Sequence, residues 1–428
     1  MKILHTSDWH LGRTLYGRKR TAEFEAFLEW LLAVLREQKI DVLLVAGDIF
    51  DTIAPPNRAQ QLYYRFLCRA SESGCRHAVI VGGNHDSPSF LDAPKELLSF
   101  LDVHVVGAVP EKIEEELLIL RGSDGLPELL VCAVPYLRDK DVRIFSANES
   151  LDDKERSLTT GIEGHYGEIG RLAVERLAQL RDSGEVGANK HVPIVATGHL
   201  FAASGQTVEG DGVRDLYVGS LGCVDVKRFP PCFDYLALGH LHSPQKIGET
   251  ARYSGSPLPM NAKEAEQGRK SVLVIDFDAI DFNAGAKIPE TKIGDAQKPS
   301  ITELAVPLFQ ELAIIEGDME FLESRLVELR ERESSAWLEI IYTGETFVPD
   351  LRERLRALTA GSGLEILRVK DARALKDVPG AWGVGEMLDE LDVSDVFLRC
   401  LDVRKVPDEA RAELLNAYRE VLASLQEM

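Results

Sequence analysis

Residues 41–51 read DVLLVAGDIFD, and this stretch decides the fold. Its apolar run, Val42 to Val45, has the length and the branched residues of a buried β-strand, and the Gly47-Asp48 pair that follows is typical of a turn at a strand end. In layered α/β folds, functional groups collect at the carboxyl ends of strands. Asp48 therefore stands where a functional side chain is expected.

The same order of apolar run, small or polar residue, and Asp, His or Asn recurs along the first two-thirds of the chain. The further examples are Ile3-Leu4 before Ser7-Asp8, Ala78–Val81 before Gly83-Asn84, Ile194–Ala196 before Gly198-His199, and Tyr235–Leu238 before Gly239-His240. Helical patterns at 23–37 and 58–73 lie between the early runs. Strands that alternate with helices predict an α/β fold with sheets buried between helices.

The remainder of the chain predicts further units, since 428 residues are too many for one ordinary core. Residues 138–165 are polar and predict an excursion before a helix at 165–182. Residues 278–300 are polar and contain Gly and Pro, as a linker does. Helices at 318–332 and 351–358, with strands at 337–342 and 364–369, predict a small α+β unit. We therefore expect domains at 1–280, 281–384 and 385–428, the last of them helical.

Composition indicates a globular protein, with 45% hydrophobic and 28% charged residues. No apolar run approaches the roughly 20 residues that span a bilayer. The first residues, MKILHTSDWH, turn polar too early for a signal peptide. We therefore expect a cytoplasmic protein that does not enter a membrane. The 6 cysteines are scattered without a CxxC pair, which favours buried free thiols over zinc ligands or disulfides.

The formal net charge of −21 argues against a protein that holds nucleic acid over its whole surface. A local basic patch, bound metal cations or a partner subunit would each allow an acidic chain to bind DNA. Charge alone nevertheless argues against a nuclease, and the motifs described next outweigh it.

The strand-end clusters supply side chains of the kinds that bind metal ions. They are Asp8, His10, Asp48, Asn84, His199, His240 and His242. Each alone has a structural explanation, such as a capping Asp, a turn, or two faces of one strand. Together, each after a predicted strand, they predict a metal centre. Mixtures of imidazole and carboxylate suit Mn²⁺, Fe²⁺ and Zn²⁺, and one Asp can bridge two ions about 3.5–4 Å apart. Two divalent ions against two carboxylates leave the site positive, as a phosphodiester requires.

These clusters resemble the motifs of the calcineurin-like metallophosphoesterase superfamily. The matching stretches are Asp8-x-His10, Gly47-Asp48-x-x-Asp51, Gly83-Asn84-His85-Asp86, Gly198-His199 and Gly239-His240-x-His242. The resemblance covers about residues 1–280 and implies a four-layer α-β-β-α sandwich, followed here by a small α+β capping domain and C-terminal helices. It implies one metal held by Asp8, His10, Asp48 and His242, and a second held by Asp48, Asn84, His199 and His240.

The same resemblance implies catalytic roles for residues that are not ligands. His85 would stabilise the transition state or protonate the leaving oxygen, and the carboxylate of Asp51 would orient His85. A helix cap is the alternative role for Asp51. For Asp86 a structural hydrogen-bonding role is favoured over a catalytic one.

Longer stretches resemble the SbcD family of nucleases. They are MKILHTSDWHLGRTLYGRKR (1–20), GDIFDTIAPPN (47–57), GIEGHYGEIGRLA (161–173), LGHLH (238–242) and YSGSPLPMNAKEAEQGRKSV (253–272). This resemblance implies a DNA repair and recombination nuclease that prefers Mn²⁺, although Mg²⁺, Fe²⁺ or Zn²⁺ would also fit the ligands. The implied activities are a 3′→5′ double-strand exonuclease and a single-strand and hairpin endonuclease. The alternatives are a phosphatase or nucleotidase acting on small phosphoesters, or a metal-free scaffold.

The resemblance also implies partners, namely DNA, an SMC-like ATPase called SbcC, and a second copy of the chain within a heterotetramer. The sequence contains no Walker loop, which agrees with ATP hydrolysis by the partner. A nucleoid-associated location follows from a DNA substrate.

Basic and aromatic residues near the first motif predict DNA contacts. These candidates are Arg13, Tyr16, Arg18, Lys19 and Arg20, with Asn57 and Arg58 further along. The alternative is a solvated helix start in which Arg18 to Arg20 pair with Glu23 and Glu25.

Apolar stripes predict protein contacts. A helix at about 407–427 carries Leu414, Leu415, Tyr418, Val421, Leu422 and Leu425, and a second carries Met387, Leu388, Leu391, Val396 and Phe397. Both could dock on the SbcC coiled coil, or else pack on their own domain. A homodimer interface could use Leu62, Tyr63, Phe66, Leu97 and Leu98, which could equally be core.

Overall fold

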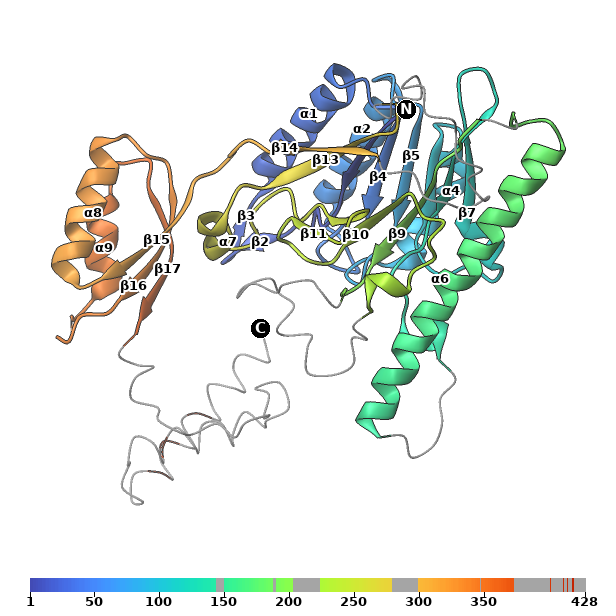
Figure 1. Ribbon diagram of the computed structural model, residues 1–428. Helices are drawn as coiled ribbons and strands as arrows, with labels where there is room; N and C mark the ends of the chain where they lie inside the picture. The colour runs from blue at the N-terminus through green and yellow to red at the C-terminus, as the bar shows by residue number, and fades with distance from the viewer. Residues whose placement is uncertain are drawn as a thin grey trace. The chain divides into compact units, whose positions relative to one another are not determined.

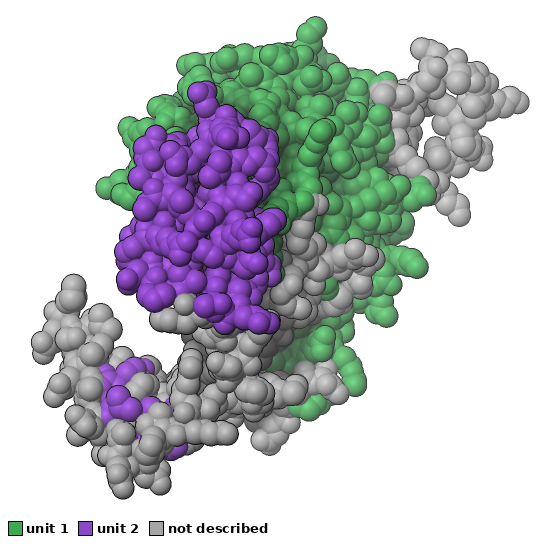
Figure 2. Space-filling view, turned by 90° about the vertical axis from the view of Figure 1, so that its left-hand side faces the viewer, with its two compact units in different colours: residues 1–313 green, residues 314–428 purple. Residues whose placement is uncertain are grey.

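The computed structural model describes residues 1–143, 150–187, 190–202, 224–278, 299–346 and 348–372, together with positions 401, 411, 414 and 418. The chain forms two compact units, residues 1–313 and 314–428, which are coloured separately in Figure 2. The first unit contains all the predicted metal ligands.

The first sheet of this unit is six-stranded, in the order β14-β13-β1-β4-β5-β6. The parallel strands are β1 (Lys2–Thr6), β4 (Val42–Ala46), β5 (His77–Val81) and β6 (Val103–Val106). Strands β13 (Ser271–Asp276) and β14 (Ser300–Ala305) extend it in antiparallel fashion. The predicted strands at 3–4, 42–45 and 78–81 are therefore confirmed as neighbours whose carboxyl ends meet at one edge.

The second sheet is also six-stranded, in the order β11-β12-β10-β9-β8-β7. Its strands are β7 (Leu117–Arg121), β8 (Pro127–Cys132), β9 (Ile194–His199), β10 (Tyr235–Gly239), β11 (Gln245–Ile247) and β12 (Ala251–Tyr253). Strands β8, β9, β10 and β12 run parallel. The strands that carry the later histidines are thus adjacent in this sheet.

Helices cover the outer face of each sheet, so that the unit has the four layers α-β-β-α (Figure 1). The first sheet packs on α1 (Thr21–Glu37), α2 (Asn57–Ser71), α3 (Pro88–Asp92) and α4 (Lys95–Ser99). The second packs on the long α6 (Leu151–Asp182). Between the sheets lies a third apolar cluster to which strand β4 contributes Val42 and Leu44, while Leu43 and Val45 face the helices. Successive side chains along β4 point to opposite faces of the sheet, so this strand contributes to two apolar cores.

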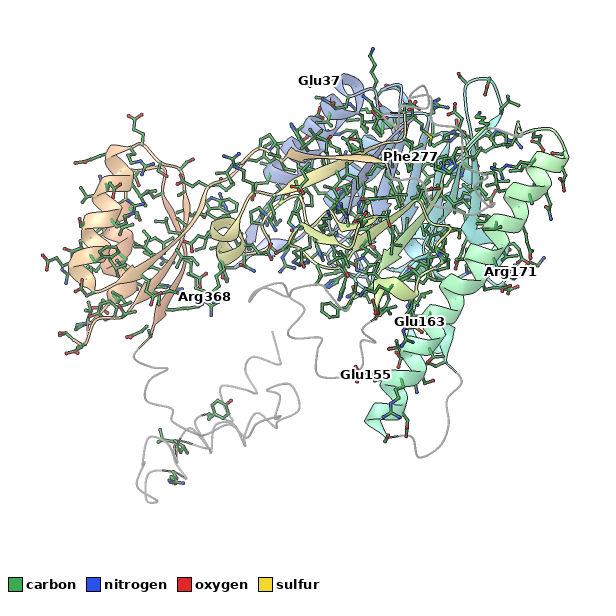
Figure 3. The ribbon with its side chains drawn as sticks, viewed as in Figure 1. Glu37, Glu155, Glu163, Arg171, Phe277 and Arg368 are labelled. Carbon is green, nitrogen blue, oxygen red and sulfur yellow. The ribbon has the colours of Figure 1, made fainter. Side chains whose placement is uncertain are left out.

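Helix α6 differs from the expectation that residues 138–165 form an excursion. A short helix α5 (Asp139–Val142) is followed by α6, which begins fourteen residues before the predicted start of 165. Ser150 caps it by accepting from the Asp153 N–H, and Leu158 and Ile162 are buried. The polar residues of this stretch, such as Glu155, are its exposed side, as is Arg171 further along (Figure 3).

Smaller elements complete the first unit. They are the hairpin β2 (Thr14–Leu15) and β3 (Arg18–Lys19), α7 (Ala262–Gln267), and the 3-10 turns η1 (Ile113–Glu116) and η2 (Val226–Arg228). Among the described helices, none is long and apolar enough to cross a membrane. Cys75, Cys132 and Cys232 are buried free thiols as expected, whereas Cys68 is exposed.

The described residues of the second unit form a small α+β arrangement, while the separation of a helical segment from it stays a prediction. A three-stranded sheet in the order β15-β16-β17 (Leu312–Gly317, Trp337–Tyr342 and Glu365–Asp371) carries α8 (Met319–Glu331) and α9 (Leu351–Thr359). The helices bury Leu322, Leu326 and Leu355. The predicted elements at 318–332, 337–342, 351–358 and 364–369 are each within two residues of those observed.

The boundary between units lies later than the predicted 280/281. Strand β14, on the far side of the undescribed residues 279–298, completes the first sheet, and the division falls at 313/314. Of the predicted helical segment 385–428, only positions 401, 411, 414 and 418 are described, all helical. The other residues of the predicted stripes, including Met387 to Phe397, lie outside the described part.

Candidate metal centre

The predicted ligands follow strand ends in strained backbone turns. Asp8, His10, Asp48 and His240 all have positive φ values, of 53°, 47°, 52° and 101°. Residues other than glycine rarely adopt this region, and such strain collects at functional sites when the surrounding structure enforces it. Here the backbone bonds Asp8 N–H to Gly47 O and His10 N–H to Asp48 O join the first two motif loops, at 3.0 Å each. The turns therefore hold these side chains in a fixed direction.

The glycines of the motifs allow the loops to approach one another. A Cβ atom on Gly83 would lie 2.1 Å from Asp48 Oδ1, and one on Gly47 would lie 2.2 Å from His199 Nδ1. Gly47 also has a φ of +89°. Both contacts are too short for any side chain, so the Gly-Asp and Gly-Asn pairs reflect close packing around Asp48.

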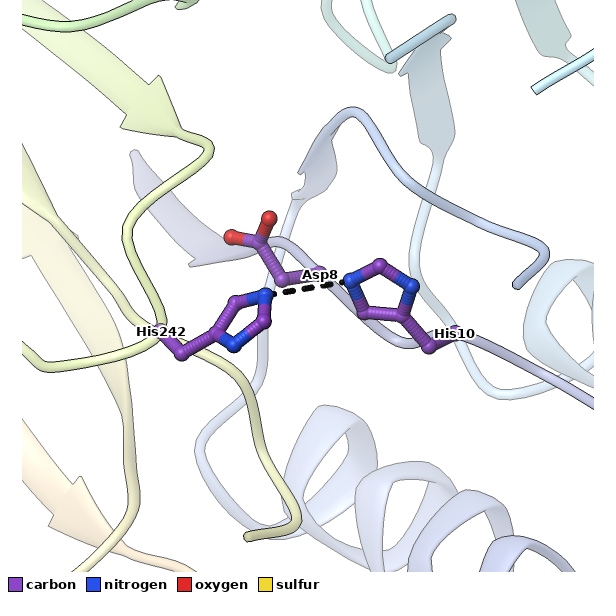
Figure 4. Close-up of side chains that lie close together, drawn as sticks. All are labelled: Asp8, His10 and His242. Atoms are coloured by element: carbon purple, nitrogen blue, oxygen red, sulfur yellow. Dashed lines mark hydrogen bonds between the residues drawn. The ribbon is translucent and has the colours of Figure 1, made fainter. Parts of the chain in front are cut away.

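Three predicted ligands from both ends of the unit meet in one cluster (Figure 4). His10 and His242 approach through their Nε2 atoms, which lie 3.2 Å apart, with Asp8 beside them. The carboxylate of Asp8 also accepts from the backbone N–H of His240 at 3.0 Å. Asp8 thereby links the first sheet to the loop after β10. Asp8 and His10 are fully buried and His242 nearly so.

Asn84, His199 and His240 form the second cluster. The Oδ1 atom of Asn84 lies 2.9 Å from His199 Nε2 and 3.2 Å from His240 Nδ1. His199 fixes its ring through Nδ1, which donates to the carbonyl of Ala46 at 2.9 Å. Asn84 is only half-buried, so this cluster opens to solvent on its side.

Asp48 lies between the two clusters. Its Oδ2 atom is 3.4 Å from His199 Nε2 and 3.6 Å from His10 Nε2, while its Oδ1 accepts from the backbone N–H of His85 at 2.9 Å. One carboxylate therefore faces an imidazole of each cluster. This is the position that a bridging ligand needs.

The contacts of the histidine ring nitrogens fit a site for cations. His10 and His242 each direct Nδ1 at a carboxylate, Asp51 and Glu264 respectively, at 3.3 Å. With the ring proton on Nδ1, the two Nε2 atoms meet as lone pairs. At His199 the Nδ1–H likewise donates to the carbonyl of Ala46. The lone pair of its Nε2 then points at the Asn84 oxygen. Lone pairs that converge in a buried site repel unless a positive charge lies among them.

The carboxylate of Asp48 acts on the same imidazoles. Burial alone would lower the pKa of His199, but the Asp48 carboxylate raises it to about 9. Burial, reinforced by His199, lowers the pKa of His240 to about 3. The two imidazoles that contact Asn84 therefore have pKa shifts of opposite direction. Divalent cations would supply a positive charge without a proton, and imidazole, carboxylate and amide oxygen suit them.

His85 and Asp51 lie beside the centre, although they contact each other differently from the expectation. The Nδ1 of His85 donates to the backbone carbonyl of Asp51 at 2.9 Å. The Asp51 carboxylate instead faces His10 and accepts from Arg13 Nη1 at 2.9 Å. The predicted carboxylate–imidazole contact between Asp51 and His85 is thus corrected to a carbonyl–imidazole contact. The half-buried His85 ring packs edge-on against His10, with centroids 4.9 Å apart.

Asp86 has the structural geometry that the sequence favoured. Its buried carboxylate accepts from the backbone N–H groups of Gly83, Ile49 and Phe50, at 2.9–3.0 Å. Burial and the nearby Asp48 raise its pKa to about 6. Asp86 ties the loop that carries Asp48 to the loop that carries Asn84.

The predicted DNA-contact residues are not all available to a ligand. Tyr16, Arg18 and Lys19 lie exposed on the β2–β3 hairpin. Arg20 is buried, makes a bidentate pair with Glu23 and donates to Pro259 O, so the pairing alternative describes it and a DNA contact does not. Asn57 and Arg58 are exposed at the start of α2, where Arg58 bonds to Gln61 and Glu25, at 2.7 and 3.2 Å.

Two buried charged residues near the centre were not anticipated. Glu264 on α7 faces His242, and Lys270 bonds to Glu264 at 2.7 Å. Both occur in the stretch 253–272, but nothing in their spacing links them to His242. Tyr136, whose ring lies edge-on to His199 with centroids 6.2 Å apart, was also missed.

Comparison with known proteins agrees with this geometry. The sequence matches the calcineurin-like phosphoesterase family over residues 1–244, and the type 5 capsule protein repressor C-terminal domain over residues 308–405. The SbcD component of nuclease SbcCD from Escherichia coli strain K12 is 33% identical over 99% of this chain and 98% of its own length. Its counterpart of the same name from Bacillus subtilis strain 168 is 37% identical over 64% of this chain and 66% of its own length. The chain therefore belongs to the calcineurin-like phosphoesterase family and, within it, to the SbcD nucleases.

Proposed function

We propose that the protein is a DNA nuclease that cleaves phosphodiester bonds at a centre of two divalent cations. One cation is held by Asp8, His10, Asp48 and His242, and the other by Asp48, Asn84, His199 and His240. Mn²⁺ is the proposed ion, because mixed imidazole and oxygen ligands without a thiolate suit it. The observation that carries the proposal is the position of Asp48. Its Oδ2 atom faces His10 of one cluster and His199 of the other.

When bound, the two cations supply electrophilic stabilisation of the phosphoryl oxygens and acidify a water molecule for attack. The chain supplies positioning and protons. Asn84 and His85 are half-buried among buried ligands, so the scissile phosphate approaches from their side. Because His85 uses its Nδ1–H to bond Asp51 O, the ring can donate to the leaving oxygen only as an imidazolium, which gives up its Nε2 proton and keeps the Nδ1 proton. Arg13, paired with Asp51 at the same rim, offers a charged donor to a phosphate.

The decisive comparison is between DNA and small phosphoesters. The proposal predicts Mn²⁺-dependent release of nucleotides from the 3′ ends of duplex DNA, and cleavage of hairpins and single strands, by the complex with its ATPase partner. Both activities should exceed hydrolysis of mononucleotides by the same preparation. Faster turnover of mononucleotides than of DNA would instead support the phosphatase or nucleotidase alternative.

The exposed β2–β3 hairpin is the proposed DNA-contact surface, with Tyr16 at its turn and Arg18 and Lys19 on its second strand. Each neutralised phosphate contributes about 0.9 to the slope of log affinity against log salt for duplex DNA. The double variant R18A/K19A should therefore lower this slope by about 2. Fluorescence anisotropy with a duplex at several salt concentrations measures the slope.

The matched control is R171A/R176A, which removes the same charge from α6. An unchanged slope in R18A/K19A, or an equal change in both double variants, would contradict the assignment of the hairpin to DNA.

We further propose that the protein acts with an SbcC-type ATPase and a second copy of itself. The relatives named as components of nuclease SbcCD support the first partner. The ATPase would dock on the helical segment proposed for residues 385–428, of which Leu414 is exposed. For self-association, the predicted Leu62, Tyr63, Phe66 and Leu98 are core residues. Leu97 and Phe100, 71% and 86% exposed, remain for an interface at α4. A chromosomal substrate would place the complex at the nucleoid.

A further inference from the structure

Glu264 is a buried carboxylate directed at a metal ligand from outside the family motifs. Its side chain is 2% exposed, and its Oε1 lies 3.3 Å from His242 Nδ1. Its Oε2 accepts from the backbone N–H of Met260 at 3.0 Å and from Lys270 Nζ at 2.7 Å. Both oxygens are therefore occupied, and the carboxylate is fixed against the imidazole.

Lys270 holds the same ligand from a second direction. Lys270 as a whole is 7% exposed, and its ammonium group donates to His242 O and to Ser256 Oγ, at 2.9 Å each. The backbone N–H of Ser256 donates to His242 O as well, at 3.1 Å. A buried ion pair is costly to desolvate and contributes little net stability on its own. At this place the pair fixes both the ring proton and the backbone of His242, so that Nε2 faces His10.

The imidazoles of the two clusters differ in what lies behind them. The Nδ1 of His242 bonds to the Glu264 carboxylate, and the Nδ1 of His10 lies 3.3 Å from the Asp51 carboxylate, an ion-pair distance without hydrogen-bond geometry. The second nitrogen of His199 bonds to the neutral carbonyl of Ala46. His240 has no hydrogen-bond partner for its buried Nε2 among the described residues. A carboxylate behind a ligand imidazole raises its basicity and its affinity for metal, which a carbonyl does less strongly.

We infer that the two cation positions are unequal, and that Glu264, held by Lys270, is a positioning residue that makes the position at Asp8, His10 and His242 the tighter one. This inference rests on the proposed binuclear centre and adds an order of loading to it. The first cation occupies the carboxylate-backed cluster, and the position at Asn84, His199 and His240 fills at higher metal concentration.

The test is a Mn²⁺ titration of the metal-stripped full-length chain. Calorimetry and the EPR signal of free Mn²⁺ both monitor binding during the titration. Wild type should bind two ions in two separable phases. In Glu264→Gln the dissociation constant of the tight phase should rise about 10- to 100-fold, with the weak phase unchanged. The control Glu266→Gln, which alters an exposed side chain of the same helix, should match wild type.

A second variant covers the case in which Glu264→Gln leaves Lys270 unpaired and does not fold. The double variant E264Q/K270M removes both buried charges and should show the same loss in the tight phase. Melting curves in the presence of a chelator report folding independently of metal.

The outcomes separate the two claims. Wild type that binds fewer than two ions per chain would contradict the binuclear centre itself. Two-ion binding in which the variants match wild type, or weaken both phases equally, would overturn only the role of Glu264.

Discussion

Asp48→Ala is expected to lose both cations and to reduce phosphodiester hydrolysis by more than about 10³-fold, since preorganised charge supplies much of the rate enhancement at such centres. The expectation follows from the place of the carboxylate between the clusters. Its Oδ2 lies 3.4 Å from His199 Nε2 and 3.6 Å from His10 Nε2. The Asp8 carboxylate also groups with His10 and His242 and, separately, with Asp48 and His199, within a wider limit of 4.8 Å.

Metal content after dialysis and DNA-end hydrolysis measure the Asp48 effect. Asn84→Ala is the informative comparison, because the Asn84 side chain contacts His199 and His240 of one cluster and its removal should cost one cation. Asp92→Asn is a control for the loss of a partly buried carboxylate. The Oδ1 of Asp92 accepts a hydrogen bond from the Gly107 N–H at 2.8 Å, and the amide oxygen of an asparagine can accept the same bond. If Asp48→Ala keeps one tightly held ion, Asp48 does not bridge.

His85→Gln should keep both cations while kcat falls about 10²- to 10⁴-fold, the range that a positioned proton donor contributes. His85 is assigned to neither cation position of the proposal, although its ring lies with His10 and Asp51 in a group whose ligand atoms are within 4.8 Å of one another. Its Nδ1 is bonded to Asp51 O, and its ring borders His10. The loss should appear in kcat rather than in KM, because the proton is needed in the transition state.

A change of leaving group tests the same role. A p-nitrophenyl phosphodiester releases a phenolate that needs little protonation, so the difference between His85→Gln and wild type should shrink with this substrate. His104→Gln, on β6, should behave as wild type with both substrates. An equal loss with both leaving groups, or loss of metal from His85→Gln, would show that His85 does not act as the proton donor.

Local patterns predicted sheets buried between helices and the approach of the strand-end side chains, whereas the four-layer arrangement was implied by the family resemblance. Alternation along β4 sends Val42 and Leu44 to one core and Leu43 and Val45 to another. Parallel strands then bring the residues after them to one edge. The strand-end positions of Asp8, Asp48 and Asn84 could therefore be predicted without knowing which strands pair.

Contacts between loops could not be predicted in this way. The carboxylate of Asp51 turns to His10 and Arg13, which belong to the loop joined to its own by the bridge between Leu11 and Phe50. That neighbour exists only once β1 and β4 are paired, and the role that the family resemblance implied for the Asp51 carboxylate named the wrong partner. The same holds for Glu264, on α7, and Lys270, just before β13, which contact His242 only in the folded chain.

Burial determines which of the basic residues near the N-terminus can contact DNA. Arg18, Lys19 and Arg20 are consecutive, yet the first two are exposed and Arg20 is buried against Glu23. The end of β3 and the start of α1 at Thr21 separate them. Residue type alone does not distinguish a phosphate contact from an internal ion pair, because the same guanidinium serves both.

Anomalous diffraction from crystals of the chain grown with Mn²⁺ would test the binuclear centre most directly. Two peaks about 3.5–4 Å apart are expected, with the Asp48 carboxylate between them and the other ligands divided as proposed. A single peak, or two peaks that do not share Asp48, would contradict the account.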